Sequence, residues 1–242
     1  MNEDTRAAAL EHGKAEFPRE ACGLVVVVKG RERYWPCQNI SPDAANDQFA
    51  MDPHDYAAAE GAGEIVGLVH THVYIPPIPS GADLVACEAT GLKWHILSLP
   101  TETWHSFEPS GYEEPLVGRV HCWGTLDCWT IVYDWYLRER GITLMNVPRM
   151  KEFWKRGEDP LGKNWRAAGF RELDEDEPLD VGDVILMQTG DSMVPNHVAL
   201  YIGDDQILHH AEGRLSSRDV YGGWYKKHTV KVVRYEGDPT ER

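Results

Sequence analysis

The chain has 242 residues, 42% of them hydrophobic and 10% aromatic, which suits one large or two modest globular domains. Its 24 basic and 39 acidic residues give a formal net charge of −15, which argues against a nucleic-acid-binding surface and against electrostatic docking to anionic membranes. No apolar run approaches the roughly 20 residues of a membrane-spanning helix. The N-terminus has neither the basic nor the apolar region of a signal peptide, so none is expected.

The five cysteines are odd in number and include no C-x-x-C pair. This pattern does not indicate a disulfide framework, and it favours synthesis in a reducing cytoplasm. Most of these cysteines are expected to be small buried hydrophobic residues.

The first half of the chain alternates helical and strand patterns, which indicates an α/β domain. Asp52 is expected to cap a helix whose first residue is Pro53. The predicted elements are a helix at 6–16, strands at 24–28 and 33–37, a helix at 53–60, a strand at 65–69, a helix at 80–90 and a strand at 94–99.

His70 and His72 end the apolar strand 65–69. Side chains two residues apart in a strand point to the same face, so both imidazoles can reach one point. A proline-rich loop follows, and Ser80 and Asp83 open the next helix. Two imidazoles and a carboxylate suit a catalytic zinc that keeps its fourth position for water. Ser80 and Asp83 also fit an ordinary helix capping box, so a purely structural role stays open.

Glu20 lies just before the apolar run at 24–28. A carboxylate at such a strand edge can hold a water molecule and move its proton. Together with the downstream residues it forms the pattern of an upstream Glu, then His-x-His, seven residues, and Ser-x-x-Asp.

This pattern resembles the JAMM (Mov34/MPN-plus) metallopeptidases, over residues 1–105. The resemblance implies that His70, His72 and Asp83 bind Zn²⁺. It also implies that Glu20 is the general acid/base and that Ser80 stabilises the oxyanion of the tetrahedral intermediate.

Residues 109–115 are rich in turn-forming and acidic residues and are the predicted linker. They separate a predicted domain at 1–108 from one at 116–242. The second domain is expected to place helices before an antiparallel sheet, an α+β arrangement. Its predicted elements are a helix at 128–140 between Asp127 and Gly141, a helical region at 151–168 interrupted by Gly157 and Pro160, and strands at 183–188, 197–202, 206–210 and 229–235.

Cys128 lies in the first turn of its helix, where the macrodipole and free N–H groups favour a thiolate. A buried cysteine that only packs at a helix start is the structural alternative. His197 begins a strand, and the turn at 203–205 returns the chain through His209. Paired antiparallel strands can bring the two histidines together, which would give a nucleophile, a base and an orienting group.

This half resembles the NlpC/P60 cysteine peptidases over residues 116–235, with Asp-Cys at a helix start, then His-Val-x-x-Tyr-x-Gly, an apolar pair and His. The resemblance implies a papain-like fold, Cys128 as nucleophile, His197 as base and His209, in preference to His210, as the third residue. It also implies peptidoglycan stem peptides as substrates.

The second half departs from the NlpC/P60 pattern before the cysteine. His121 occupies the place where the family has a tyrosine, so no oxyanion role is transferred to it. Cys122 also lies nearby, but it lacks the helix-start position and is the weaker nucleophile candidate.

A JAMM half followed by an NlpC/P60 half resembles the tail assembly peptidases of lambda-like siphophages. This implies a tail-tip peptidase that cuts peptidoglycan during genome entry and binds other tail-tip proteins. It would be made in the host cytoplasm, carried in the virion tail tip, and active in the periplasm or cell wall. One alternative is a structural plug or assembly factor with latent or occluded sites. Another is a deubiquitinase-like or sulfur-carrier-processing enzyme, which leaves the second half without a role.

Overall fold

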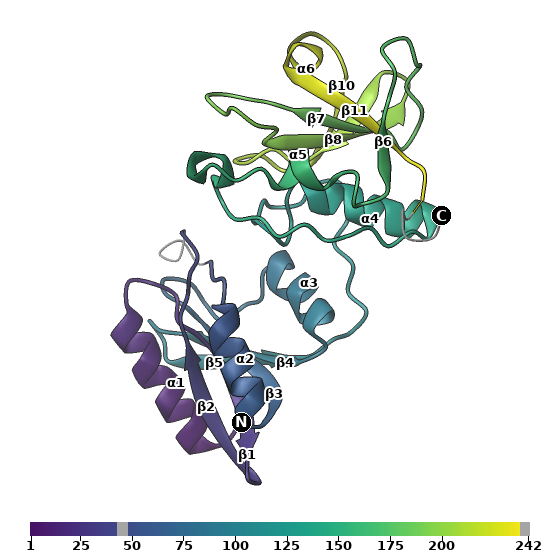
Figure 1. Cartoon of the computed structure of the whole chain (residues 1–242). Helices are drawn as coiled ribbons and strands as arrows, with labels where there is room; N and C mark the ends of the chain where they lie inside the picture. Colours follow the sequence, from purple (N-terminus) through teal and green to yellow (C-terminus); the bar gives the residue numbers. More distant parts are fainter. Residues whose placement is uncertain (43–47, 238–242) are drawn as a thin grey trace. The chain divides into compact units, whose positions relative to one another are not determined.

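The computed structural model describes residues 1–42 and 48–237. It contains two compact units, Met1–Glu113 and Glu114–Arg242 (Figure 1). The division between them falls inside the segment predicted as a linker. Among the described residues, no helix combines the length and the apolar character needed to cross a membrane.

The first unit is built on a five-stranded sheet in the order β2-β1-β3-β4-β5. β3 and β4 pair in parallel, and the other neighbouring strands pair antiparallel. The elements are α1 (Glu3–Glu16), β1 (Cys22–Val28), β2 (Arg31–Cys37), α2 (Pro53–Ala62), β3 (Glu64–His72), α3 (Gly81–Thr90), β4 (Lys93–Ser98) and β5 (Thr103–Phe107).

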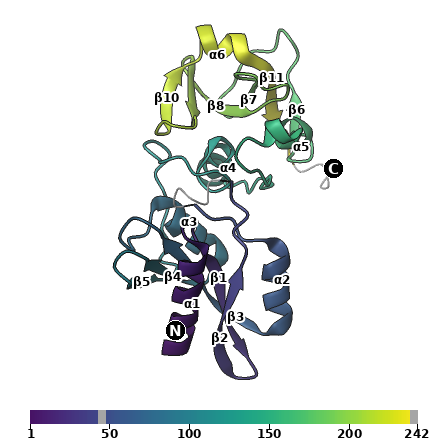
Figure 2. The ribbon, with the colours of Figure 1, turned by 90° about the vertical axis from the view of Figure 1, so that its left-hand side faces the viewer.

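Both faces of β1 are covered, which explains its continuous apolar sequence. Leu24 and Val26 pack on one face with Ala59 of α2. Val25 points to the other face and packs with Ala9 of α1. Figure 2 shows α1 and α2 on opposite sides of this sheet. The α/β class predicted for this half is confirmed, but the sequence prediction missed β5, a short strand of largely exposed residues at the sheet edge.

The second unit is built on a six-stranded sheet in the order β10-β9-β8-β7-β11-β6, in which neighbouring strands pair antiparallel. The predicted α+β class is therefore confirmed. The elements are α4 (Cys128–Arg140), the 3₁₀ helix η1 (Phe153–Arg156), α5 (Pro160–Asn164), β6 (Phe170–Glu172), β7 (Val184–Met187), β8 (His197–Gly203), β9 (Gln206–His209), β10 (Ser217–Val220), α6 (Gly223–His228) and β11 (Thr229–Tyr235).

Two helices cover opposite faces of this sheet, as Figures 1 and 2 both show. Ile131 and Val132 of α4 pack with Val198 and Leu200 of β8 in the larger core. Tyr225 of α6 packs against the cluster on the other face, which includes Ala199 and Ile207. The alternation of strand side chains thus gives the sheet two buried faces.

The helical region predicted at 151–168, interrupted by Gly157 and Pro160, forms in part, and the break lies where it was predicted. Only η1 and α5 form there, because Gly157 adopts a left-handed conformation with φ 75° and ends η1. Pro160 then starts α5, where a missing N–H costs nothing. Four apolar residues of the segment are buried in the core beside α4 without a continuous helix: Phe153, Leu161, Trp165 and Ala168.

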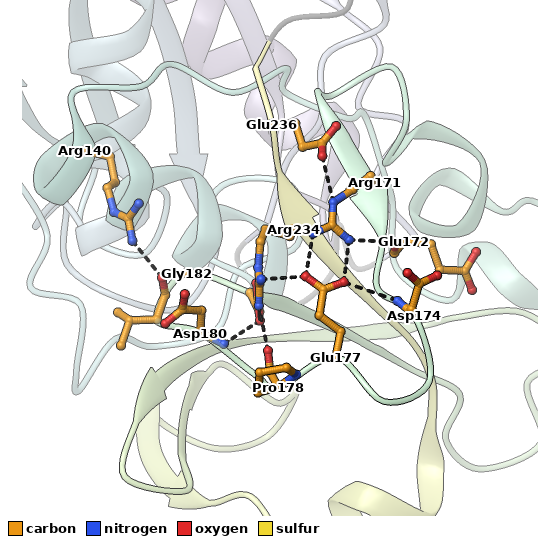
Figure 3. Close-up of polar contacts among 12 residues, drawn as sticks. Arg140, Arg171, Glu172, Asp174, Glu177, Pro178, Asp180, Gly182, Arg234 and Glu236 are labelled. Atoms are coloured by element: carbon orange, nitrogen blue, oxygen red, sulfur yellow. Dashed lines mark hydrogen bonds and ion pairs between the residues drawn. The ribbon is translucent and has the colours of Figure 1, made fainter.

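An ion network fastens the edge strand β6 to β11 (Figure 3). Arg171 of β6 and Arg234 of β11 both bind the Glu177 carboxylate, at 2.5 and 2.7 Å. Arg234 also binds the buried Asp183, at 2.7 Å. Because most of these groups are partly exposed, the network orients the two strands but adds little to the free energy of folding.

Candidate active sites

The end of β3 brings two imidazoles together in the first unit. His70 and His72 are both buried, and their Nε2 atoms lie 3.3 Å apart. The cause is the strand itself, because residues two apart project to the same face. His70 lies opposite Cys22 of β1 in the sheet, which fixes its depth in the unit.

Asp83 approaches these imidazoles from the first turn of α3. Its Oδ1 lies 3.4 Å from His70 Nε2, and its Oδ2 lies 3.9 Å from His72 Nε2. Ser80 caps the helix: its Oγ accepts a hydrogen bond from the Asp83 backbone N–H at 3.1 Å. The Ser80 hydroxyl and N–H both donate to Asp83 Oδ2 at 2.7 Å. The capping box is therefore present, and it orients the carboxylate toward the histidines.

Glu20 completes the cluster from the segment that leads into β1. Its side chain is buried, and Glu20, His70 and His72 offer possible ligand atoms within 4.8 Å of one another. The structure thus brings together the five residues singled out in the sequence of this half. Their roles remain predictions.

The donor set fits a zinc ion. Zinc–nitrogen and zinc–oxygen bonds of about 2.0–2.2 Å in tetrahedral geometry place neighbouring ligand atoms about 3.3–3.6 Å apart. The 3.3 and 3.4 Å separations match this spacing, and the 3.9 Å separation requires a small side-chain rotation. His72 Nδ1 also donates to the Pro76 carbonyl at 2.7 Å, which leaves Nε2 free to bind a metal. No pattern in the sequence points to this carbonyl as a partner of His72.

Cys128 begins α4, and a buried ion pair holds its helix start. Asp127 is the N-cap, and its Oδ1 accepts from the N–H groups of Trp129 and Thr130 at 3.0 and 3.2 Å. Asp127 Oδ2 accepts from Gly124 at 2.8 Å. Arg149 binds the same carboxylate, and both side chains are fully buried. The ion pair therefore fixes the position from which the cysteine projects.

Cys128 is buried, with 2% of its surface exposed. Burial raises the pKa of its thiol to about 12, and the charge of Asp127 acts in the same direction. Backbone hydrogen bonds from Val198 and Trp129 favour the thiolate but do not outweigh burial. Burial thus opposes the thiolate that the helix start favours, because desolvation exceeds the effect of the helix dipole.

The predicted base, His197, starts the strand whose backbone contacts this cysteine. Val198, whose backbone contacts the thiol, directly follows His197. Antiparallel pairing of β8 and β9 places His209 opposite Ala199, and His197 Nε2 lies 3.0 Å from His209 Nδ1. Burial, then the neighbouring His209, lowers the pKa of His197 to about 3. The resting pair is therefore a neutral thiol and a neutral imidazole.

A cavity of about 550 Å³ opens at these residues. Cys128, His197 and His209 line it, and three tryptophans supply apolar walls: Trp123, Trp154 and Trp224. His210 also lines the cavity, but His209 is the residue hydrogen-bonded to His197. The cavity is large enough for a peptide segment beside the thiol.

Residues that the sequence analysis missed lie behind His209. His209 Nε2 contacts Asp219 Oδ2 at 3.0 Å, and Tyr225 donates to the same oxygen. Both come from elements, β10 and α6, that were not predicted. Arg149 was missed as well, because it lies in irregular chain.

Comparison with known proteins relates the whole chain to phage tail-tip proteins. The chain is 37% identical over 238 residues to "Tail tip assembly protein K" of Escherichia phage N15, covering 98% of this chain and 96% of that protein. It is 34% identical over 188 residues to "Tail tip assembly protein K" of Escherichia phage lambda, covering 76% of this chain and 89% of that protein. The chain belongs to the tail tip assembly protein K family.

Family models match each half separately. The model of prokaryotic homologs of the JAB domain matches residues 2–109, and the NlpC/P60 family model matches residues 118–234. The N-terminal domain is therefore JAMM/MPN-like, and the C-terminal domain belongs to the NlpC/P60 type. Both resemblances inferred from the sequence are confirmed.

Solved structures with similar folds include representatives of both domains. A JAB1/MPN domain protein from Archaeoglobus fulgidus is 19% identical, with a TM-score of 0.31. The match covers 46% of this chain and 89% of the Archaeoglobus protein. An NlpC/P60 family protein from Bacillus cereus is 14% identical, with a TM-score of 0.36. The match covers 93% of this chain and 66% of the Bacillus protein.

Proposed function

We propose that this protein is a tail-tip peptidase whose C-terminal domain hydrolyses amide bonds of peptidoglycan stem peptides during genome entry. The observation that carries the proposal is the shared cavity of Cys128 and His197, with His209 hydrogen-bonded behind the base. The names of the two relatives support a place in the tail tip, with other tail-tip proteins as partners. The net charge of −15 disfavours nucleic acid as a ligand.

The catalytic cycle follows from the neutral resting pair. His197 accepts the thiol proton as Cys128 sulfur attacks the amide carbonyl, and it then delivers that proton to the leaving amine. Water hydrolyses the resulting thioester, with His197 again as base. Because the thiol is neutral before substrate binds, proton transfer accompanies the attack and does not precede it. His209 holds the base in position and stabilises the cation that forms.

For the N-terminal domain we propose a zinc-dependent, peptidase-type site. His70, His72 and Asp83 would hold Zn²⁺, which when bound would supply an activated water. Glu20 is buried beside the imidazoles and would carry the proton from the water to the leaving group. Ser80 Oγ donates to Asp83, so a role in stabilising the oxyanion requires that this hydroxyl turn toward the substrate.

A structural tail-tip plug with latent sites is the second candidate. The observation that favours it is the burial of Cys128, which leaves 2% of the residue exposed. The open cavity beside the thiol favours the enzyme instead. Under the peptidase proposal the protein is made in the host cytoplasm, travels in the tail tip, and acts in the periplasm or cell wall.

Digestion of defined muropeptides tests the proposal. Wild type is expected to release stem-peptide fragments, and Cys128→Ala is expected to lose this activity by more than about 1,000-fold. The double variant His70→Ala/His72→Ala is measured for zinc content by elemental analysis, where loss of the metal is expected. Unchanged hydrolysis by Cys128→Ala would overturn the cysteine-peptidase proposal. Inactive wild-type protein with an unreactive Cys128 would favour the plug.

A further inference from the structure

The hydrogen-bonded chain behind Cys128 does not end at His209. Asp219 of β10 lies diagonally across from His209 of β9, where Ser217 pairs with His209 and Asp219 pairs with Ile207. His209 Nε2 lies 3.0 Å from Asp219 Oδ2. A cross-strand diagonal of this kind is within reach of long side chains on one face of a sheet.

Several donors surround the Asp219 carboxylate. The Tyr225 hydroxyl donates to Oδ2, and Arg214 Nη2 lies 3.4 Å from the same atom. Ser217 Oγ donates weakly to Oδ1, at 3.4 Å. Burial alone would oppose ionisation, but the hydrogen bonds from Tyr225 and His209 outweigh it and lower the pKa of Asp219 to about 2. Asp219 is therefore a carboxylate at neutral pH, and a carboxylate can only accept hydrogen bonds.

The charge of Asp219 decides which nitrogen of His209 carries a proton. Because the carboxylate only accepts, His209 Nε2 must donate. Tyr225 lies 3.3 Å from the same nitrogen, and since its single hydrogen is used on Asp219 it can offer His209 only a lone pair. Burial lowers the pKa of His209, which keeps the ring neutral at neutral pH. A neutral imidazole protonated on Nε2 has a bare Nδ1.

The tautomer of His209 in turn sets the tautomer of the base, His197. Bare Nδ1 of His209 accepts from Nε2 of His197, across the 3.0 Å contact. His197 is also neutral, so its proton sits on Nε2 and its Nδ1 carries the lone pair. Nδ1 is thus the nitrogen that can take the thiol proton. If Asp219 were uncharged, this order of protons would no longer be imposed.

We propose that Asp219, held by Tyr225 and Arg214, is a positioning residue that fixes the tautomers of His209 and His197 and so presents His197 Nδ1 to Cys128 as the base. The proposal rests on the peptidase function proposed above. Asp219 touches none of the reacting atoms and acts through two rings. Loss of the correct tautomer alone can be severe for a histidine base.

The test uses the full-length protein labelled with ¹⁵N-histidine. The matched variants are Asp219→Asn, which removes the charge at nearly constant shape, and Asp204→Asn, which removes one charge at the exposed β8–β9 turn. Long-range ¹H–¹⁵N spectra report the tautomer of each ring. Wild type and Asp204→Asn are expected to show His209 and His197 protonated on Nε2. Asp219→Asn is expected to show a second tautomer of His209.

Kinetics give the second readout. In Asp219→Asn we expect alkylation of Cys128 by iodoacetamide, followed by peptide mapping, to slow by about 10- to 100-fold. We expect kcat for muropeptides to fall by a similar factor, while KM changes by less than about twofold. Asp204→Asn should match wild type in both assays.

The proposal is overturned if Asp219→Asn keeps the wild-type tautomers and alkylation rate. It is also overturned if wild-type His209 is protonated on Nδ1, a result that needs no folded variant. A tautomer switch in a protein that never cuts muropeptides would support the positioning role and reject the peptidase function. The two failures are therefore distinguishable.

Discussion

The buried ion pair beneath the α4 start makes a quantitative prediction. Arg149→Ala removes the cation that faces Asp127 and leaves a carboxylate with no exposed surface. Breaking such a pair from one side costs about 3–5 kcal/mol. Three backbone N–H groups, from Gly124, Trp129 and Thr130, still bind Asp127, so we expect the lower end, about 3 kcal/mol.

The cost should depend on pH in a defined direction. Burial opposes ionisation of Asp127, but Arg149 and the backbone donors lower its pKa in the folded protein. In the wild type this stabilisation is present above the unfolded pKa of about 3.9 and is lost as pH falls through the lower folded value. Without Arg149 the folded pKa should rise, because burial is then less opposed. The variant therefore regains part of its stability as pH falls toward about 4. The difference in free energy of unfolding between wild type and Arg149→Ala is then largest at neutral pH.

The assay is hydrogen exchange of the α4 amides at increasing urea concentration, because the two units need not unfold together. The control is Arg156→Ala, whose guanidinium pairs with Glu158 at 2.7 Å on the surface. Such exposed pairs contribute at most about 1 kcal/mol. An Arg149→Ala variant that loses no more free energy of unfolding than Arg156→Ala at neutral pH would refute the importance of this ion pair. A difference in free energy of unfolding that grows toward acid pH would refute the charges assigned to Asp127 and Arg149.

Two further predictions concern the two sites. Burial raises the pKa of Cys128 to about 12, so the rate of its alkylation should rise steadily with pH through the neutral and alkaline range. A rate that is instead constant down to acid pH would reveal a preformed ion pair of the Cys128 thiolate with a protonated histidine. Removal of zinc by a chelator should lower the thermal midpoint of the N-terminal domain, since the ion binds only the folded cluster. The same treatment should leave His70→Ala/His72→Ala unaffected, and equal shifts in both proteins would contradict the assigned ligands.

Local sequence signals predicted the elements that carry the two sites. α4 runs from Cys128 to Arg140 as expected, because Asp127 and Gly141 are strong start and stop signals. The two-residue period of a strand likewise predicted that the side chains of His70 and His72 lie close together. These features depend on neighbours in sequence, and such information is readable from one chain.

What the sequence could not predict depends on contacts between distant segments. Asp219 reaches His209 only through the register of β10, a four-residue edge strand with no strong apolar pattern. Arg149 finds Asp127 from an irregular segment 22 residues away. The pKa of Cys128 depends on distant contacts as well. The helix dipole is visible in the sequence, whereas the burial that outweighs it is a property of the whole core.

The central claim is that Cys128 is the nucleophile of a peptidoglycan peptidase. Its most direct test is mass spectrometry of the acid-quenched protein during digestion of a defined muropeptide. We expect a transient mass increase that equals the acyl part of the substrate and maps to Cys128, and we expect neither this adduct nor cleavage in Cys128→Ala. Cleavage that persists in Cys128→Ala, with no acyl group on Cys128 of the wild type, would contradict it.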